Sequence, residues 1–292
     1  MAATTRSGKP IPLPPMDLRL MQDSDEQFVR SGVSLAQVLY RYGLKSGDSL
    51  IDVGCSVGRL PIGLLAGTDF HGRYLGFDVM SRQVAWAAQH LAPVTPGFTF
   101  AHLDVRNDRY NPRGTVAPEN VRFPSGAARF DFCCLFSIFT HFYKVDIQHY
   151  LHEIRRVLKP GGLVVATWFL YDERRLPKAM ESPVYPMAHR LDEVTIYAEL
   201  SDPLRAIAYD EGFVRTMVKN AGLEVIRVDR GKWAGEEADE FQDFVLLRRP
   251  EDSVAVRLRR WAGRSVRAAT GRLRGPRRDT DPPAPGVDSP GS

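Results

Sequence analysis

The sequence predicts an α/β fold of the Rossmann-like type, with a doubly wound, mostly parallel seven-stranded sheet whose last strand is antiparallel. Short apolar runs alternate with segments of helical periodicity, which favours parallel strands joined by helices. The apolar runs are continuous, as expected for strands that are covered on both faces. Glycine or aspartate residues follow several runs, at the edge where open parallel sheets bind ligands.

The expected elements can be placed along the chain from apolar spacing and turn residues. Helical spacing runs from Asp17 to Tyr42, and we expect Gly32 to divide it into two N-terminal helices. The expected strands are 49–53, 73–77, 98–103, 130–136, 163–169, 223–228 and 243–247. The expected helices between them are 58–67, 81–91, 145–158 and 210–221. Segment 106–129 is expected to be irregular, and Lys-Pro-Gly-Gly at 159–162 to form a turn.

The domain organisation follows from length and composition. A chain of 292 residues with 43% hydrophobic residues can form one large domain with appendages. We expect a flexible N-terminus at 1–15 and a main domain at 16–250. Four prolines interrupt the alternation at 171–207, which predicts an inserted cap. Residues 251–292 are basic and proline-rich, so we expect a largely disordered tail.

Charge and cysteine content restrict the function classes. The tail holds nine arginines and five acidic residues, so it carries the whole net charge of +4 and the rest is neutral. A neutral body argues against binding of nucleic acid. No apolar run reaches membrane-spanning length and no secretory signal is visible. Three cysteines, two of them adjacent, predict reduced thiols and a cytoplasmic location.

A glycine-containing loop follows the first predicted strand and is the first candidate for a ligand site. Asp52, Gly54 and Gly58 follow the pattern Asp-Xaa-Gly-Xaa-Xaa-Xaa-Gly, which permits a tight turn and close approach of a ligand. A dinucleotide fingerprint would need further glycines where Ser56 and Arg59 stand. S-adenosylmethionine (SAM) has no phosphate and needs only a glycine turn with room for its methionyl tail. The loop therefore favours SAM over a dinucleotide.

Polar residues also end the second and third predicted strands. Asp78 can accept hydrogen bonds from ribose hydroxyls, and Val79 or Met80 can pack on the adenine. Asp104 can accept a bond from the adenine amino group. Simpler roles remain open, since Asp78 could cap the following helix and Asp104 could stabilise a turn. Convergence of three such strand ends on one edge favours a binding site.

These motifs together resemble the class I SAM-dependent methyltransferases, in particular the ubiquinone/menaquinone-type small-molecule branch. The matching pieces are Asp-Val-Gly-Cys at 52–55, Gly-Phe-Asp at 76–78, the strand 130–137 and Leu-Lys-Pro-Gly-Gly at 158–162. The resemblance covers about residues 30–250. It implies SAM as the cofactor and S-adenosylhomocysteine (SAH) as its product. Many members have glycine where this chain has Ser56.

The resemblance implies a role for each matching residue. Those expected around the methionyl part of SAM are Asp52, Gly54, Cys55, Ser56 and Gly58. Those expected around the adenosine are Asp78, Val79, Met80, Asp104 and Val105. Phe136 and Ser137 are expected to line the sulfonium.

The acceptor end is less constrained. His141 is the candidate general base for a hydroxyl acceptor, although it could instead orient its loop or pack beside Phe139 and Phe142. The other six histidines lack the spacing of metal ligands, so no metal is expected. The candidates for stacking on the acceptor, each of which could equally pack in the core, are Tyr110, Trp168, Tyr171 and Trp233.

The leading functional hypothesis is O-methylation of a small molecule. Tyr-Asn-Pro at 110–112 and Phe-Gln-Asp at 241–243 resemble methyltransferases of glycan or glycolipid pathways. Alternatives are a quinone, aromatic or lipid acceptor, a non-catalytic SAM-binding protein, a dinucleotide oxidoreductase and a nucleic-acid methyltransferase. The tail contains a basic amphipathic stretch at 253–267, which is either a weak membrane-surface contact or a solvated extension. The sequence does not predict an oligomeric state.

Overall fold

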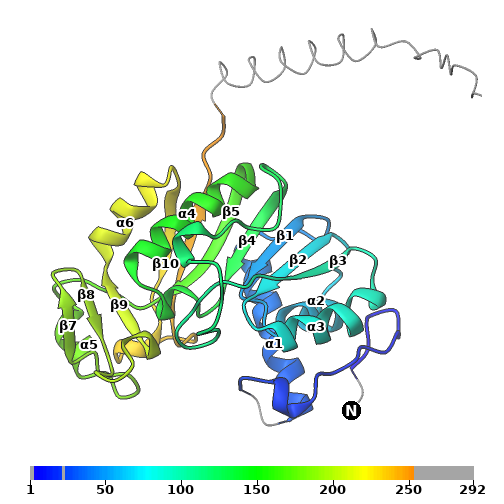
Figure 1. Ribbon diagram of the computed structural model, residues 1–292, viewed down its shortest axis with the longest axis horizontal. Coiled ribbons are helices and arrows are strands. Elements are labelled where there is room, and N and C mark those ends of the chain that lie inside the picture. Colours follow the sequence, from blue (N-terminus) through cyan, green and yellow to red (C-terminus); the bar gives the residue numbers. More distant parts are fainter. Residues whose placement is uncertain (1–2, 22–23, 253–292) are drawn as a thin grey trace, which may run out of the picture. The chain divides into compact units, whose positions relative to one another are not determined.

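A seven-stranded sheet forms the centre of the protein, whose computed structural model describes residues 3–21 and 24–252 (Figure 1). Its strands are β1 (Ser49–Val53), β2 (Arg73–Asp78), β3 (Phe98–His102), β4 (Phe130–Leu135), β5 (Leu158–Trp168), β10 (Glu224–Asp229) and β11 (Asp243–Arg248). They lie in the order β3-β2-β1-β4-β5-β11-β10, and β11 is antiparallel to both neighbours. The fold class expected from the sequence is confirmed.

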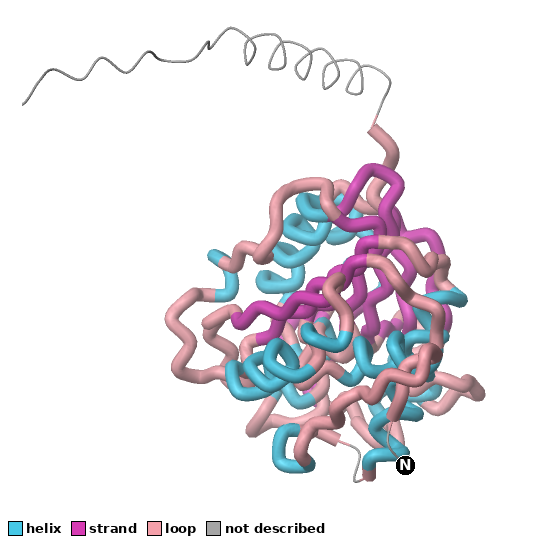
Figure 2. The backbone as a smooth tube through the Cα atoms, turned by 90° about the vertical axis from the view of Figure 1, so that its right-hand side faces the viewer, coloured by secondary structure: helices cyan, strands magenta, loops and turns pink. Residues whose placement is uncertain are grey.

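Helices cover both faces of this sheet, with the strands running between them (Figure 2). The helices are α1 (Asp25–Arg41), α2 (Arg59–Gly67), α3 (Ser81–His90), α4 (Lys144–Val157) and α6 (Glu211–Asn220). Successive residues of β4 alternate between two cores: Cys133 packs with residues of α4 and α6, and Cys134 with residues of α1 and α2. Because both faces are buried at the centre of the sheet, the residues of β1 and β4 are mostly apolar, whereas the edge strand β10 is partly exposed and carries charged residues.

Helix α1 runs without interruption through Gly32, so the predicted division into two helices is wrong. The helix begins after Ser24, whose side chain accepts a hydrogen bond from the Gln27 amide at 3.2 Å. A Cβ atom at Gly32 would lie 2.3 Å from the carbonyl oxygen of Arg59. A Cβ atom at Gly63 of α2 would lie 2.0 Å from the carbonyl oxygen of Gly32. The two glycines thus allow the helix backbones to cross in contact.

The N-terminal segment has a buried anchor that composition did not predict. Ile11 is 4% exposed and belongs to the core beneath α1 and α2. The Lys9 ammonium donates to the carbonyl oxygens of Pro93 and Val94, at 3.2 and 2.5 Å. Residues 3–15, expected to be flexible, therefore contact the segment that follows α3.

The Lys-Pro-Gly-Gly segment, predicted as a turn, is part of β5 in the structure. Phe130 pairs with Leu158 but Phe132 pairs with Leu163, so β5 bulges between these positions. Gly161 adopts a φ of 79° within the bulge, a left-handed conformation that favours glycine. The segment is therefore irregular, but it forms a bulge within β5 and not a turn before the strand.

The predicted cap is a second, smaller sheet after β5. Its elements are β6 (Leu170–Tyr171), α5 (Leu176–Met180), β7 (His189–Asp192), β8 (Thr195–Tyr197) and β9 (Ile207–Asp210), with the strands in the order β6-β9-β8-β7. The buried Arg175 guanidinium lies 3.1 Å from the Asp243 carboxylate and forms a second ion pair with Glu236. This network fastens the cap to the start of β11.

Short 3-10 helices and the chain end complete the described fold. The 3-10 helices are η1 (Met16–Leu18), η2 (Ala92–Val94), η3 (Pro118–Asn120), η4 (Phe139–His141), η5 (Pro203–Arg205) and η6 (Lys232–Ala234). The chain divides into two units at Pro250. The predicted tail helix at 253–267 lies outside the described residues. Among the helices that are described, none is long and apolar enough to cross a membrane.

Candidate active site

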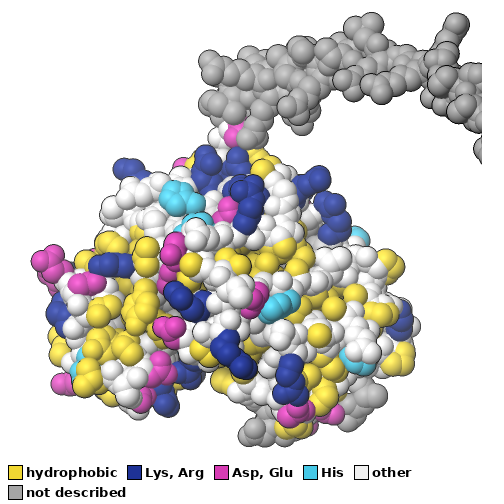
Figure 3. Space-filling model, in the orientation of Figure 1, with side chains coloured by type: hydrophobic (Ala, Val, Ile, Leu, Met, Phe, Trp, Pro, Cys, Tyr) yellow, Lys and Arg dark blue, Asp and Glu magenta, His cyan; other side chains and the backbone are white. Residues whose placement is uncertain are grey.

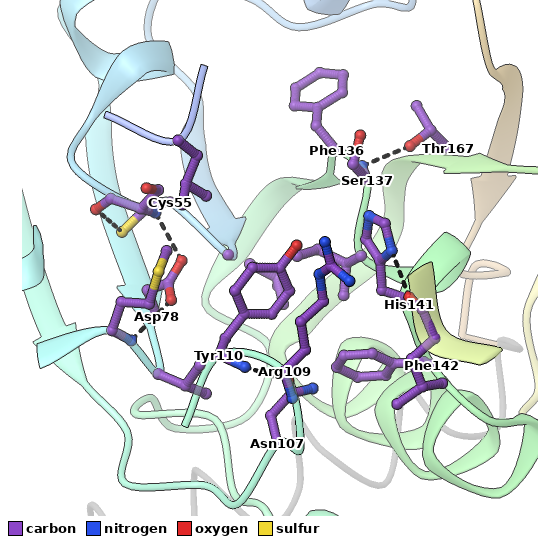
Figure 4. A pocket seen from close by; sticks show the side chains of 18 of the residues that line it. Cys55, Asp78, Asn107, Arg109, Tyr110, Phe136, Ser137, His141, Phe142 and Thr167 are labelled. Atoms are coloured by element: carbon purple, nitrogen blue, oxygen red, sulfur yellow. Dashed lines mark hydrogen bonds between the residues drawn. The ribbon is translucent and has the colours of Figure 1, made fainter. Parts of the chain in front are cut away.

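A cavity of about 920 Å³ lies at the carboxyl ends of β1, β2 and β4. Its walls come from the loop after β1, the end of β2, segment 103–110, segment 136–143 and the residues before β11. Figure 4 shows Cys55 and Asp78 on one side and Ser137 and His141 on the other. Since these segments are far apart in the sequence, only the sheet order brings them together.

The loop after β1 is fastened to the end of β2. The amides of Gly54 and Cys55 both donate to the Phe77 carbonyl oxygen, at 2.9 and 3.1 Å. Ser56 has a φ of 48°, the left-handed conformation in which glycine is favoured. Its amide donates to the Asp78 carboxylate at 2.7 Å, which helps to hold this conformation. Gly58, with a φ of 93°, is the N-cap residue of α2.

Asp78 is a buried carboxylate at the cavity wall, 7% exposed. One oxygen accepts from the Ser56 amide and the other from the Met80 amide, at 2.7 and 2.9 Å. Burial raises the pKa of Asp78, and the bonds from Met80 and Ser56 partly oppose this. The Val79 amide is a further donor to this carboxylate, whose remaining acceptor capacity can take a hydroxyl. Met80 itself is the N-cap residue of α3, so Asp78 does not occupy the position of the helix cap.

Asp52 forms part of the cavity floor at the end of β1 and is 3% exposed. The Tyr74 hydroxyl donates to its carboxylate at 2.6 Å, and the Cys134 thiol lies 3.5 Å from the other oxygen. Burial raises the pKa of Asp52 to about 6, against the lowering effect of these two bonds.

The structure does not bring Asp104 into the cavity. One carboxylate oxygen accepts from the hydroxyl and amide of Thr115, at 2.7 and 3.2 Å, and the other accepts from the Asn111 side chain at 3.1 Å. Asp104 therefore stabilises the first part of the irregular segment 106–129, up to Thr115, which is the alternative turn role. The neighbouring Leu103 and Val105 line the cavity instead. Val79 and Met80 also line it, so this end is largely apolar.

Phe136 and Ser137 lie at the end of β4 and line the cavity, as expected. Ser137 has a φ of 57° and donates its amide to the Thr167 hydroxyl at 2.7 Å. Its own hydroxyl donates to the Gln242 side chain at 3.0 Å. These two bonds hold the chain at the point where it turns from β4 into η4, which ends at His141.

The His141 ring lines the cavity and has a defined orientation. Its Nδ1 lies 2.8 Å from the Leu204 carbonyl oxygen, so Nδ1 carries the proton and Nε2 the lone pair (Figure 4). Burial, with a further contribution from Arg109, lowers the pKa of His141. The ring centroid lies 6.2 Å from that of Tyr110. A neutral imidazole with a free lone pair is the form that can accept a proton.

Three of the four aromatic acceptor candidates are core residues. Tyr110 lines the cavity, but Trp168 and Trp233 are fully buried and Tyr171 is 4% exposed. Trp168 packs on Phe139 with ring centroids 4.5 Å apart. Trp168 and Tyr171 lie on β5 and β6, and Trp233 lies in η6, where its indole donates to the buried Asp243 at 2.8 Å. These three aromatic residues therefore pack in the core, which is the alternative role that the sequence left open.

The cavity also contains residues for which no functional role was expected from the sequence, among them Arg109, Asp146 and Tyr185. Arg109 lies over the Tyr110 ring and pairs with Asp202 of the cap. Burial and, second, the charge of Glu119 raise the pKa of Asp146 to about 6. Arg109 could have been expected near the cavity because it directly precedes the acceptor candidate Tyr110. Tyr185 carried no signal, because only tertiary packing brings the cap here.

The comparisons with known proteins decide the family. A model of the methyltransferase domain matches residues 30–228. This chain belongs to the methyltransferase domain family.

Among the described residues, no group of three or more histidine, cysteine, aspartate or glutamate side chains can hold a metal ion.

Solved structures show the same fold at low sequence identity. A Pyrococcus horikoshii protein is 19% identical, with a TM-score of 0.50 over 78% of this chain and 93% of its own. A SAM-dependent methyltransferase from Mesorhizobium loti is 15% identical, with a TM-score of 0.50 over 76% of this chain and 100% of its own. For a putative sarcosine dimethylglycine methyltransferase from Galdieria sulphuraria the identity is 13% and the TM-score 0.50, over 77% and 86%.

Proposed function

We propose that this methyltransferase transfers the methyl group of SAM to a hydroxyl of a small-molecule acceptor, with His141 as the general base. The observation that carries this proposal is the bond from His141 Nδ1 to the Leu204 carbonyl oxygen, 2.8 Å long. It leaves Nε2 as a proton acceptor in the cavity wall. A hydroxyl must lose its proton when it is methylated, and a base in the cavity wall can accept that proton.

The chain's own residues suit the cofactor. SAM supplies an activated methyl group, so binding and orientation are the protein's main contributions. Asp78 accepts the ribose hydroxyls through its remaining lone pairs. The loop Gly54–Gly58 surrounds the methionyl part, and Asp52 lies beneath it. Val79, Met80 and Val105 supply an apolar surface for the adenine, which requires no contribution from the Asp104 side chain.

Two loops border the acceptor end and limit its exposure to water. Arg109 in the excursion after β3 pairs with Asp202 in the cap, which links two segments over the cavity. Tyr110 contacts Arg109 through its ring, with the guanidinium 5.6 Å from the ring centroid. Enclosure of this kind protects the methyl group from hydrolysis and strengthens electrostatic interactions within the site.

A small molecule fits this site better than nucleic acid. The 920 Å³ cavity is within the range of small-molecule sites. On the face drawn in Figure 3, basic and acidic side chains are interspersed, whereas a nucleic-acid backbone is bound by concentrated positive charge.

A quinone or other aromatic acceptor is the second candidate, as for the ubiquinone/menaquinone-type branch. It is favoured by the aromatic residues of the acceptor end: Tyr110, Phe142, Phe169, Tyr185 and Phe241. Its phenolic hydroxyl would use the same base.

Methyl transfer from labelled SAM into fractionated metabolites tests the proposed function. We expect label in a small molecule that is stable to mild base, as an ether is. Label in an ester, an amine or no fraction at all would contradict O-methylation of a hydroxyl. Retention of SAM binding without any labelled product would favour a non-catalytic SAM-binding protein.

A further inference from the structure

We propose that the acceptor site extends beyond the main cavity, across Tyr185 and Arg205, and takes a glycoside of at least two sugar rings. This inference rests on the proposed function, because it names the class of acceptor for the same site. The features that carry it are an aromatic cluster at the cavity wall and a second hollow that shares two residues with the cavity.

The aromatic cluster consists of Phe169, Tyr185 and Phe241, which all line the cavity. The ring centroids of Phe169 lie 5.9 Å from Tyr185 and 6.0 Å from Phe241, and those of Tyr185 and Phe241 are 6.0 Å apart. Phe169 is 1% exposed and forms the base of the cluster. Tyr185 and Phe241 are partly exposed, so their rings are available to a ligand.

This cluster is held in place by bonds beneath it. The Tyr185 amide donates to the Ser182 hydroxyl at 3.3 Å, and that hydroxyl donates to the Trp233 carbonyl oxygen. The Trp233 amide donates in turn to the Phe241 carbonyl oxygen at 3.0 Å. The indole of Trp233 donates to the buried Asp243 at 2.8 Å. A cluster positioned in advance loses little entropy when a ligand binds.

The second hollow, of about 220 Å³, lies against the outer side of the cluster. Its lining residues are Val184, Tyr185, Pro186, Ala198, Glu199 and Arg205. Tyr185 and Arg205 also line the main cavity, so they stand between the two spaces. A ligand longer than one ring can therefore occupy both.

The polar groups of the second hollow indicate which kind of ring it takes. Glu199 and Arg205 form an ion pair of 3.1 Å, and both are partly exposed to solvent. A carboxylate and a guanidinium offer several acceptors and donors to vicinal hydroxyls. A purely aromatic or alkyl group would remove water from these charges without replacing the lost hydrogen bonds. Aromatic faces beside charged, planar side chains therefore favour a polyhydroxylated ring, whose C–H face stacks while its hydroxyls bond.

The experiment is saturation-transfer NMR and calorimetric titration of the full chain loaded with SAH. The probes are methyl glycosides of one, two and three rings built from glucose, galactose or mannose, with p-nitrophenol and octanoate as non-sugar probes. We expect at least one sugar series to bind, with affinity rising about threefold or more from one ring to two. Tyr185→Ala should weaken the two-ring probe about five- to tenfold, the scale of one aromatic contact. Tyr185→Phe should retain most of the affinity, since the ring remains.

The control variant is Ile226→Ala, a partly exposed residue on β10 outside both spaces, which should bind the probes as the native chain does. SAH affinity and thermal midpoint, measured on every variant, separate a local effect from misfolding. Absence of binding by every glycoside overturns the inference, as does equal affinity for one and two rings or stronger binding of p-nitrophenol or octanoate. Each of these outcomes leaves methyl transfer from SAM to another acceptor intact. Failure of SAH to bind would instead contradict the cofactor site itself.

Discussion

The Nδ1 atom of His141 lies 2.8 Å from the carbonyl oxygen of Leu204, which belongs to η5 in the cap. The cap thus fixes which ring nitrogen of the candidate base carries its proton. The loop after β4 supplies the imidazole ring, and the cap after β5 supplies the carbonyl oxygen that selects its tautomer. The chemistry of the site therefore depends on the cap as well as on the central sheet.

Replacement of His141 tests its role as the base. We predict that His141→Ala lowers kcat by about 10²- to 10⁴-fold, the usual contribution of a general base. Affinity for SAH should remain within about twofold, because the ring lies on the acceptor side. His141→Gln should be equally slow, since an amide cannot accept the proton. Near-normal turnover of both variants in a labelled-SAM assay would assign His141 a packing role.

The pH dependence of the reaction follows from the same residue. Burial lowers the pKa of His141 below its ordinary value of 6.5, so the neutral, active form persists to a lower pH than usual. We predict that kcat/KM rises with pH through this lowered pKa and is level at neutral pH. A profile that falls across the same interval would be incompatible with a neutral histidine base. In His141→Gln this acid limb should disappear.

Asp52 is predicted to make the stability of the fold depend on pH. Its folded pKa of about 6 lies above the ordinary value of 3.8, so the folded state holds the proton more tightly. The stabilisation is fully present below pH 3.8 and is lost as pH rises through 6, on the order of 3 kcal/mol. Urea unfolding of native chain and Asp52→Asn from pH 4 to 7 measures it. Equal pH slopes for the two proteins would contradict this assignment.

The crossing of α1 and α2 is predicted to be intolerant of a methyl group. Gly63→Ala would place Cβ 2.0 Å from the Gly32 carbonyl oxygen, so the helices must separate. We expect a loss of about 1–3 kcal/mol or more in the free energy of unfolding. Gly47→Ala is the matched control, since its Cβ would meet the nearest atom, on His71, only at 3.7 Å. A stable Gly63→Ala protein would show that the helices need not lie so close.

Asp104 is predicted to act on its loop and not on the cofactor. Asp104→Ala removes the acceptors of Asn111 and Thr115, so segment 105–116 should become more sensitive to limited proteolysis. Affinity for SAH should change less than threefold. A tenfold or greater loss of affinity without increased cleavage would restore the adenine contact first expected for this residue.

Most of the sheet could be predicted because its central strands are largely apolar runs with turn signals beside them. The failures have physical causes. Gly32 predicts a break in the helix, since the sequence does not reveal that Gly63 packs against it. The direction of the Asp104 side chain depended on Thr115, eleven positions away. The burial of Trp168 depends on the register of β5, and that of Trp233 on its bond to Asp243, and neither is visible in the sequence.

The cofactor end was predictable to a greater extent than the acceptor end. Gly54, Ser56 and Asp78 lie at strand ends, whose position at the sheet edge follows from topology alone. The acceptor end is assembled from the cap and from the segment before β11. Tyr185 reaches it through packing across more than forty residues of sequence, for which neither periodicity nor spacing gives a signal.

The most direct test of the account is calorimetric titration of the full chain with SAH, beside Asp78→Ala and Asp104→Ala. The account predicts one site for SAH on the native chain, no binding of NAD, and a loss of about ten- to hundredfold in affinity for Asp78→Ala, the value of hydrogen bonds to a charged group. Asp104→Ala should bind nearly as the native chain does. A native chain that fails to bind SAH, or that binds it equally well without the Asp78 carboxylate, would contradict the proposed cofactor site.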